Sequence, residues 1–145
     1  MDRPELLSAL QLDRFIAFDF ETTGLDVTND RPIEVAAILF ERGKATSRFC
    51  SLINPLQPIS SLIQDITGIS NEMVSEAPKE KDVIANLLDF LGDYPIVAHN
   101  TPFDVAFLQA MADRNDKKLP DRKYYDTLTL SRSFLFFQPT HNLSA

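Results

Sequence analysis

Three apolar segments of strand-like length come first along the chain. Phe15 to Glu21 begins with a continuous apolar run and lacks the polar alternation of a half-exposed strand, so it predicts a central strand buried on both faces. Ile33 to Phe40 and Thr46 to Ile53 flank the polar segment 41–44, a pattern typical of a β-hairpin. We therefore expect an antiparallel meander of three strands.

The next strongly patterned segment is helical. Ser60 and Ser70 are each expected to cap a short helical turn. A longer amphipathic helix is expected to lie on the sheet and to end at Gly92. Its apolar stripe repeats at helical spacing and consists of Val83, Ile84, Leu87, Leu88 and Leu91.

A second strand and helix follow this segment. Ile96 to Ala98 predicts a short buried strand, and the next helix is expected to have Thr101 as its N-cap and Pro102 at its first position. Tyr124 to Asp126 predicts a last strand, and 127–136 a last helix. The order predicts an α/β fold with a mixed sheet of about five strands, three antiparallel and then two parallel, flanked by helices on both sides.

Length and composition are those of one globular domain. The 145 residues are 44% hydrophobic and 24% charged, so residues 1–145 are expected to form a single domain with an ordinary core. No apolar run approaches the roughly 18 residues of a membrane span, and we expect no membrane association. The single cysteine, Cys50, excludes an internal disulfide and is expected to be buried. Together these features favour a cytoplasmic protein.

The charge of the chain limits how it could bind nucleic acid. A net charge of -7 argues against salt-driven adhesion to a duplex, although enzymes that bind phosphodiesters through cations concentrate acids at their site. The one dense basic cluster is expected to be a solvated loop and consists of Lys117, Lys118, Arg122 and Lys123.

Asp19 and Glu21 are the first candidates for chemistry. Side chains two residues apart on a strand project from the same side, about 6.6 Å apart along the backbone, and two carboxylates so placed can hold a divalent cation. The following Thr22, Thr23 and Gly24 offer hydroxyls and a backbone that a phosphate or sugar could approach closely. The alternative is a pair of surface acids at the end of a strand.

Asp104 is the third candidate acid. It falls in the first turn of the helix that follows His99 and Asn100, two polar residues at the end of a buried strand. The alternative interpretation is structural, because a carboxylate at the third helical position complements the helix dipole and can bond back toward Thr101.

Several segments together resemble one enzyme family. From Arg14 onward the chain is similar to the DnaQ-like DEDD 3′ to 5′ exonucleases, above all the proofreading epsilon subunits of DNA polymerase III and polymerase-linked exonuclease domains. The segments that carry the resemblance are Asp19-Phe-Glu-Thr-Thr-Gly, Ile66-Thr-Gly-Ile-Ser-Asn-Glu-Met-Val74, His99-Asn-Thr-Pro-Phe-Asp104, Asp126-Thr-Leu and Ser131-Arg132.

The resemblance implies a ribonuclease H-like fold and a specific site. It implies two divalent cations, Mg²⁺ or Mn²⁺, held by Asp19, Glu21 and Asp104, with Asp19 shared between them. It implies a nucleic-acid 3′ end as substrate, with single-stranded DNA favoured, and a DNA polymerase subunit as a partner. Residues implied to contact or support the substrate are Thr22, Thr23, Gly24, Leu25, His99, Asn100 and Phe103, with Thr23 near the 3′-hydroxyl, whereas Asp126 is implied to be structural.

Two features of the family are missing. It needs a fourth acid and a general-base histidine on a later helix, and the segment around His141 resembles the stretch before that motif. We therefore expect a fragment that lacks its C-terminal helix or helices and has little activity, since losing a general base typically costs 10²–10⁴ in rate. The alternatives are a naturally short, non-catalytic nucleic-acid or polymerase-binding module, and an RNA-trimming exoribonuclease.

Overall fold

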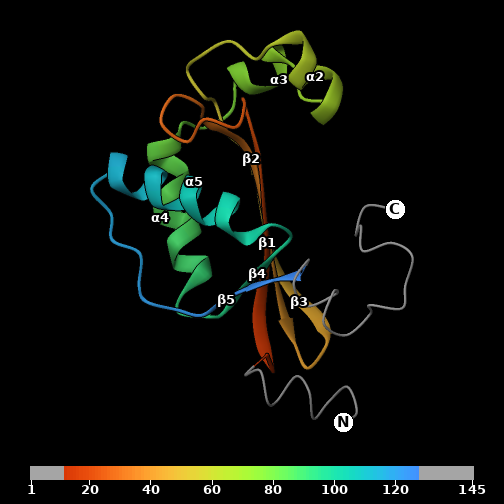
Figure 1. The fold of residues 1–145 in the computed structure, drawn as a ribbon, viewed down its shortest axis with the longest axis vertical. Helices are drawn as coiled ribbons and strands as arrows, with labels where there is room; N and C mark the ends of the chain where they lie inside the picture. The colour runs from red at the N-terminus through yellow and green to blue at the C-terminus, as the bar shows by residue number, and fades with distance from the viewer. Residues whose placement is uncertain (1–11, 128–145) are drawn as a thin grey trace.

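The computed structural model describes residues 12–127 and contains one five-stranded sheet (Figure 1). Its strands are β1 (Arg14–Thr22), β2 (Pro32–Glu41), β3 (Lys44–Leu52), β4 (Ile96–Ala98) and β5 (Tyr124–Asp126), in the spatial order β3-β2-β1-β4-β5. β1, β2 and β3 pair antiparallel, whereas β4 pairs parallel with β1 and with β5. The predicted mixed sheet, a meander followed by two parallel strands, is confirmed.

Four helices lie between β3 and β5. They are α2 (Ser61–Thr67), α3 (Asn71–Ser75), α4 (Glu80–Leu91) and α5 (Thr101–Arg114). The predicted caps of the two short helices are confirmed, because the Ser60 hydroxyl accepts from the Ile63 amide and the Ser70 hydroxyl from the Met73 amide. Among residues 12–127, no helix is long and apolar enough to cross a membrane.

The main core lies between one face of the sheet and the helices α4 and α5 (Figure 1). On that face β1 presents Ile16, Phe18 and Phe20, which pair across the strands with Leu39, Ala37 and Val35 of β2. The predicted apolar stripe of α4 packs there, with Val83, Ile84, Leu87 and Leu91 fully buried.

The other face of β1 is more open than the sequence suggested. Phe15 and Ala17 are only half-buried and Asp19 is exposed, so the prediction of a strand buried on both faces is wrong. An apolar hollow of about 590 Å³ lies on this face, lined among others by Phe15, Ala17, Ile38, Phe40 and Val97. The helix predicted from residue 127 to 136 lies almost wholly outside the described residues, and helical cover of this face stays a prediction.

Two further expectations about single residues are wrong. Cys50 is exposed on β3 rather than buried, because β3 is an edge strand with six exposed positions. Arg122 is not part of a solvated loop: its guanidinium donates to the carbonyls of Leu91, Gly92 and Tyr94, at 2.6 to 3.2 Å. That side chain instead ties the C-terminal end of α4 to the segment before β5.

Candidate active site

The acid pair lies where β1 extends beyond its short parallel neighbour. Because buried and open positions alternate along β1, Asp19 and Glu21 project from the same face, as the spacing predicted. This face is opposite to the main core. Asp19 is exposed and Glu21 is half-buried. Directly across the antiparallel pair, Glu21 faces Glu34 of β2, and the register shifts immediately after it. Three carboxylates therefore lie on two adjacent strands.

Asp104 reaches this end of β1 from the first helical turn of α5. The β1–β4 pairing covers Ile16 and Ala17, after which the chain leaves the sheet to begin α5. Beyond this pairing, the amide of Phe20 donates to Asp104 Oδ1 at 3.0 Å. Phe20 lies between Asp19 and Glu21 in sequence, so the hydrogen bond holds the third acid beside the first two. Asp104 is only 2% exposed.

Burial raises the pKa of all three acids, and neighbouring negative charges add to the shift at Glu21 and Asp104. Burial raises the pKa of Asp104 from 3.8 to about 7, the Phe20 amide opposes the shift, and the charges of Asp19, Glu21 and Asp126 add to it. Burial also raises the pKa of Glu21, with further contributions from Asp19 and Glu34, and burial raises the pKa of Asp19. The site is thus a cluster of like charges whose ionisation is disfavoured until a cation offsets it.

A strained turn between β4 and α5 sets the position of Asp104. Asn100, not Thr101, is the N-cap of α5, and its backbone is left-handed with φ 63° and ψ 57°. The Asn100 amide donates to Asp126 Oδ1 at 3.0 Å, and the Thr101 hydroxyl lies 2.7 Å from the carbonyl oxygen of Tyr125. The predicted Thr101 cap is wrong, because the Thr101 hydroxyl donates instead to the Tyr125 carbonyl of β5. The end of β5 therefore holds the start of α5.

His99 and Phe103 flank this turn in the sequence. His99 is exposed, and its Nδ1 lies 3.1 Å from the Thr127 hydroxyl, which fits its expected support of the strand end. Phe103 is half-buried and packs on Phe107, with ring centroids 4.8 Å apart.

The segment after β1 is tightly bonded within the protein. The Thr22 hydroxyl donates to the Gly24 carbonyl at 2.6 Å. The Thr23 hydroxyl lies 3.1 Å from Asp30 Oδ1 and 2.8 Å from Gln57 Oε1, and it accepts from the Arg31 amide at 3.0 Å. These hydroxyls, expected to face a ligand, are engaged by other groups of the protein.

Gly24 and Leu25 complete this segment. A Cβ at Gly24 would collide with the carboxylate of Asp30, so the absence of a side chain makes room for a protein group. Leu25, which follows it, is 85% exposed. Among the residues expected to cradle a terminal nucleotide, Leu25 presents the side chain that is open to a ligand.

The donor set fits divalent cations in its chemistry. Carboxylate oxygens are the ligands that Mg²⁺ and Mn²⁺ prefer, and a cation would relieve the repulsion described above. Within residues 12–127, no three Asp, Glu, His or Cys side chains are gathered closely enough to hold one common ion as they stand. The neighbouring acids could divide between two ions, with remaining ligands from water, substrate or other parts of the chain.

Comparison with known proteins identifies the family of this chain. Residues 16–145 match the model of the exonuclease family, RNase T type. The chain belongs to the exonuclease family. The suspected DnaQ-like relationship is therefore confirmed.

Two relatives are similar to this chain over most of its length. The exonuclease domain is 42% identical over 123 residues to the PolC-type DNA polymerase III of Latilactobacillus sakei, covering 85% of this chain and 8% of that protein. It is 38% identical over 120 residues to the 3′-5′ exonuclease DinG of Bacillus subtilis, covering 82% of this chain and 13% of that protein. The chain thus spans less than a seventh of either relative.

The fold is shared with a solved exonuclease. The structure of E. coli exonuclease I with a dA16 oligonucleotide superimposes with a TM-score of 0.77 at 20% identity, over 88% of this chain and 31% of that chain. At that identity the likeness shows the fold, and the fold is that of exonucleases.

Three residues of this exonuclease domain that bear on the site were not predicted. The β1–β2 register places Glu34 opposite Glu21. Its position near the start of a predicted strand could have marked it as a further candidate acid. Asp30 and Gln57 contact Thr23 from 7 and 34 residues away, and no local pattern marks them. The sequence identified the acids, whereas their supporting groups come from other segments.

Proposed function

We propose that this exonuclease domain removes nucleotides from DNA 3′ ends with two divalent cations, Mg²⁺ or Mn²⁺. The observation that carries the proposal is the hydrogen bond from Phe20 to Asp104, which gathers a buried acid and the Asp19–Glu21 pair at one end of β1. When bound, the cations would polarise the scissile phosphodiester and stabilise the leaving oxygen.

The residues of the chain have distinct tasks in this proposal. Asp19, Glu21 and Asp104 would hold the cations, with Asp19 shared between them. The exposed side chain of Leu25 packs against the terminal nucleotide, and the backbone of Thr22 to Gly24, made rigid by its internal hydrogen bonds, positions the sugar. Asn100 and Phe103 line the approach to the phosphate, and His99 supports the turn that presents them.

DNA is the substrate that the relatives favour. The PolC-type proteins are named as DNA polymerases, and E. coli exonuclease I has been solved with bound oligonucleotides. These similarities support a single-stranded DNA end as substrate and a polymerase subunit, or a polymerase part of the same polypeptide, as partner.

We also propose that the site is completed by a segment C-terminal to the described residues. A fourth acid and a histidine that deprotonates the attacking water would come from that segment. The apolar hollow on the open face of β1 supports the proposal, because Phe15, Ala17 and Ile38 line it together with Asp19 itself.

A direct nuclease assay tests this proposal. The complete polypeptide as its gene encodes it is incubated with 5′-labelled single-stranded DNA and Mg²⁺ or Mn²⁺, beside its Asp19→Ala and Asp104→Asn variants. We expect a ladder of strands that shorten from the 3′ end, lost in both variants and retained in Asp89→Asn, which removes an exposed carboxylate of α4. An unshortened strand with the complete polypeptide would refute the proposal, and faster shortening of a matched RNA would move it to an exoribonuclease.

A further inference from the structure

A basic cleft lies apart from the acid site. It has a volume of about 500 Å³ and is bounded by residues 54–57, the start of α4 and the end of α5. Its charged lining consists of Arg31, Lys79, Glu80, Lys81 and Arg114. In a chain with a net charge of -7, four cations and one acid around a single hollow are an uneven distribution.

Only part of this positive charge is neutralised by the protein. Arg114 pairs with Glu80 at 2.8 Å, and the side-chain amide of Asn115 also donates to that carboxylate. Among residues 12–127, neither Lys79 nor Lys81 makes an ion pair. Both lysines are exposed, and the side chain of Arg31 is oriented by donating to the carbonyls of Thr28 and Asp30. Three positive charges therefore remain available to a ligand.

The cleft is joined to the segment proposed to hold the terminal nucleotide. Gln57 lines the cleft and lies 2.8 Å from the Thr23 hydroxyl, while its amide donates to the Asn29 carbonyl. Arg31, also in the lining, donates its backbone amide to the same Thr23 hydroxyl. A polymer that leaves the site past Thr23 would meet Gln57 first and then the lysines.

We propose that this cleft binds the phosphate backbone of the strand that extends away from the 3′ end. The proposal rests on the proposed function, because it takes nucleic acid as the substrate. Its ligand is a run of phosphodiesters, recognised by charge and not by base identity. Lys79 and Lys81 neutralise phosphates, and Arg31 does so at the end of the cleft nearest Thr23.

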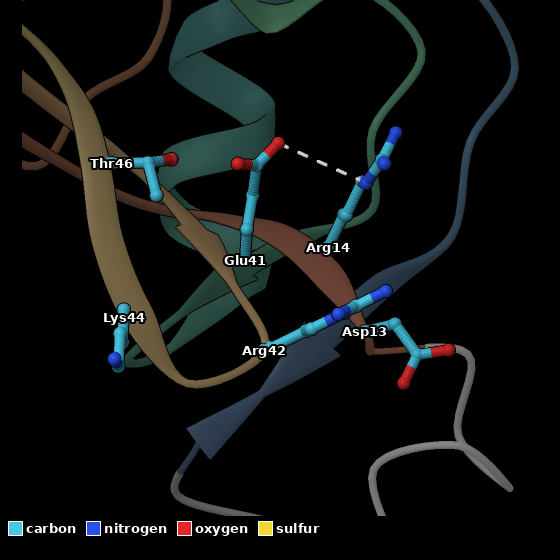
Figure 2. Close-up of a pocket in the computed structure, with 6 residues that line it drawn as sticks. All are labelled: Asp13, Arg14, Glu41, Arg42, Lys44 and Thr46. Carbon is cyan, nitrogen blue, oxygen red and sulfur yellow. Dashed lines mark ion pairs between the residues drawn. The ribbon is translucent and has the colours of Figure 1, made fainter.

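A second hollow provides a matched control. It lies at the opposite end of β1, around the β2–β3 turn, and is lined by Arg14, Arg42 and Lys44 together with Asp13 and Glu41 (Figure 2). Arg14 pairs with Glu41 at 3.8 Å, so less positive charge remains there. The double variant Arg42→Gln with Lys44→Gln removes two positive charges, as many as Lys79→Gln with Lys81→Gln.

Binding of a DNA strand measured in EDTA tests the cleft without any turnover of the strand. Fluorescence anisotropy would follow a labelled single strand of about sixteen nucleotides, long enough for a typical single-strand groove, across a range of salt concentrations. Each lost phosphate contact reduces the salt slope by about 0.7, so Lys79→Gln with Lys81→Gln should lower the slope by about 1.4 and the affinity by roughly 10- to 30-fold at 0.1 M salt. The control pair should leave the slope as in the unmodified protein.

A kinetic comparison links the cleft to strand length. The ratio of kcat/KM for the long strand to kcat/KM for the p-nitrophenyl ester of thymidine 5′-monophosphate should fall about tenfold in the Lys79 and Lys81 double variant, through KM. An unchanged salt slope in the Lys79 and Lys81 double variant, or an equal change in the control pair, would overturn the proposal. Either result would favour an acidic protein as the partner that binds the cleft. Failure of the proposed function would show differently, as no turnover of either substrate while the binding difference persists.

Discussion

The buried charge of Asp104 makes a specific prediction about stability. Its pKa lies at about 7 in the folded protein instead of 3.8, so folding favours the protonated form. The stabilisation is complete below about pH 4 and is lost as the pH rises through 7, because ionisation then costs more in the folded chain than in the unfolded one. The difference corresponds to about 4 kcal/mol, at about 1.4 kcal/mol per pH unit.

Asp104→Asn removes this cost while keeping the hydrogen bond from Phe20, since the amide oxygen can still accept it. In EDTA, the unfolding free energy of the variant relative to the unmodified chain should rise by about 4 kcal/mol between about pH 4 and pH 8. Urea unfolding followed by circular dichroism at several pH values measures this difference. Asp89→Asn, at an exposed position on α4, should change stability by under about 0.5 kcal/mol.

Cations should offset part of this cost in the unmodified chain. At about pH 8, Mg²⁺ at a hundred times its dissociation constant should add about 2.7 kcal/mol to the unfolding free energy. The Asp104→Asn variant should gain less, because one carboxylate is lost. A difference between variant and unmodified chain that stays constant with pH would refute the reasoning that burial and neighbouring acids disfavour the ionised form.

Three further substitutions test the surroundings of the site. Asp126→Ala should destabilise the domain by about 1 to 2 kcal/mol and speed hydrogen exchange of the Asn100 amide, which loses its acceptor, whereas Asp126→Asn should restore most of the protection measured by NMR. Gly24→Ala should cost about 1 to 3 kcal/mol in thermal unfolding through its clash with Asp30, and Asp30→Ala should relieve most of that cost; an equal loss in both backgrounds would contradict the clash. Glu34→Gln should stabilise the cation-free domain by about 0.2 to 1 kcal/mol at neutral pH by removing a like charge opposite another on the sheet, and a loss of stability in urea unfolding would show that Glu34 has a favourable partner.

The fold was predictable from the sequence because its signals are local. Apolar runs and the polar segment 41–44 predicted the meander, an apolar run predicted β4, helical spacing predicted α4, and the serine caps predicted where two short helices begin. Each of these signals depends on neighbours within a few residues along the chain. Asp19, Glu21 and Asp104 were identifiable for the same reason, because each lies at the end of a predicted strand or in the first turn of a predicted helix.

Contacts between distant segments were not predictable in this way. The openness of the second face of β1 depends on what packs against it, and the opposition of Glu21 and Glu34 depends on the strand register. Asn100, rather than the predicted Thr101, is the N-cap of α5, because the Asn100 amide and the Thr101 hydroxyl both bond to residues of β5.

By itself the sequence determined the family, the order of the strands and helices, and the three acids that define the proposed site. Only the tertiary structure decided that Asp104 bonds to β1 between the other two acids, that the threonine hydroxyls turn inward, and that a basic cleft adjoins the loop after β1. The physical reason is that patterns along a chain report local conformation, whereas distances and electrostatic coupling between remote side chains arise only when the sheet and helices pack together.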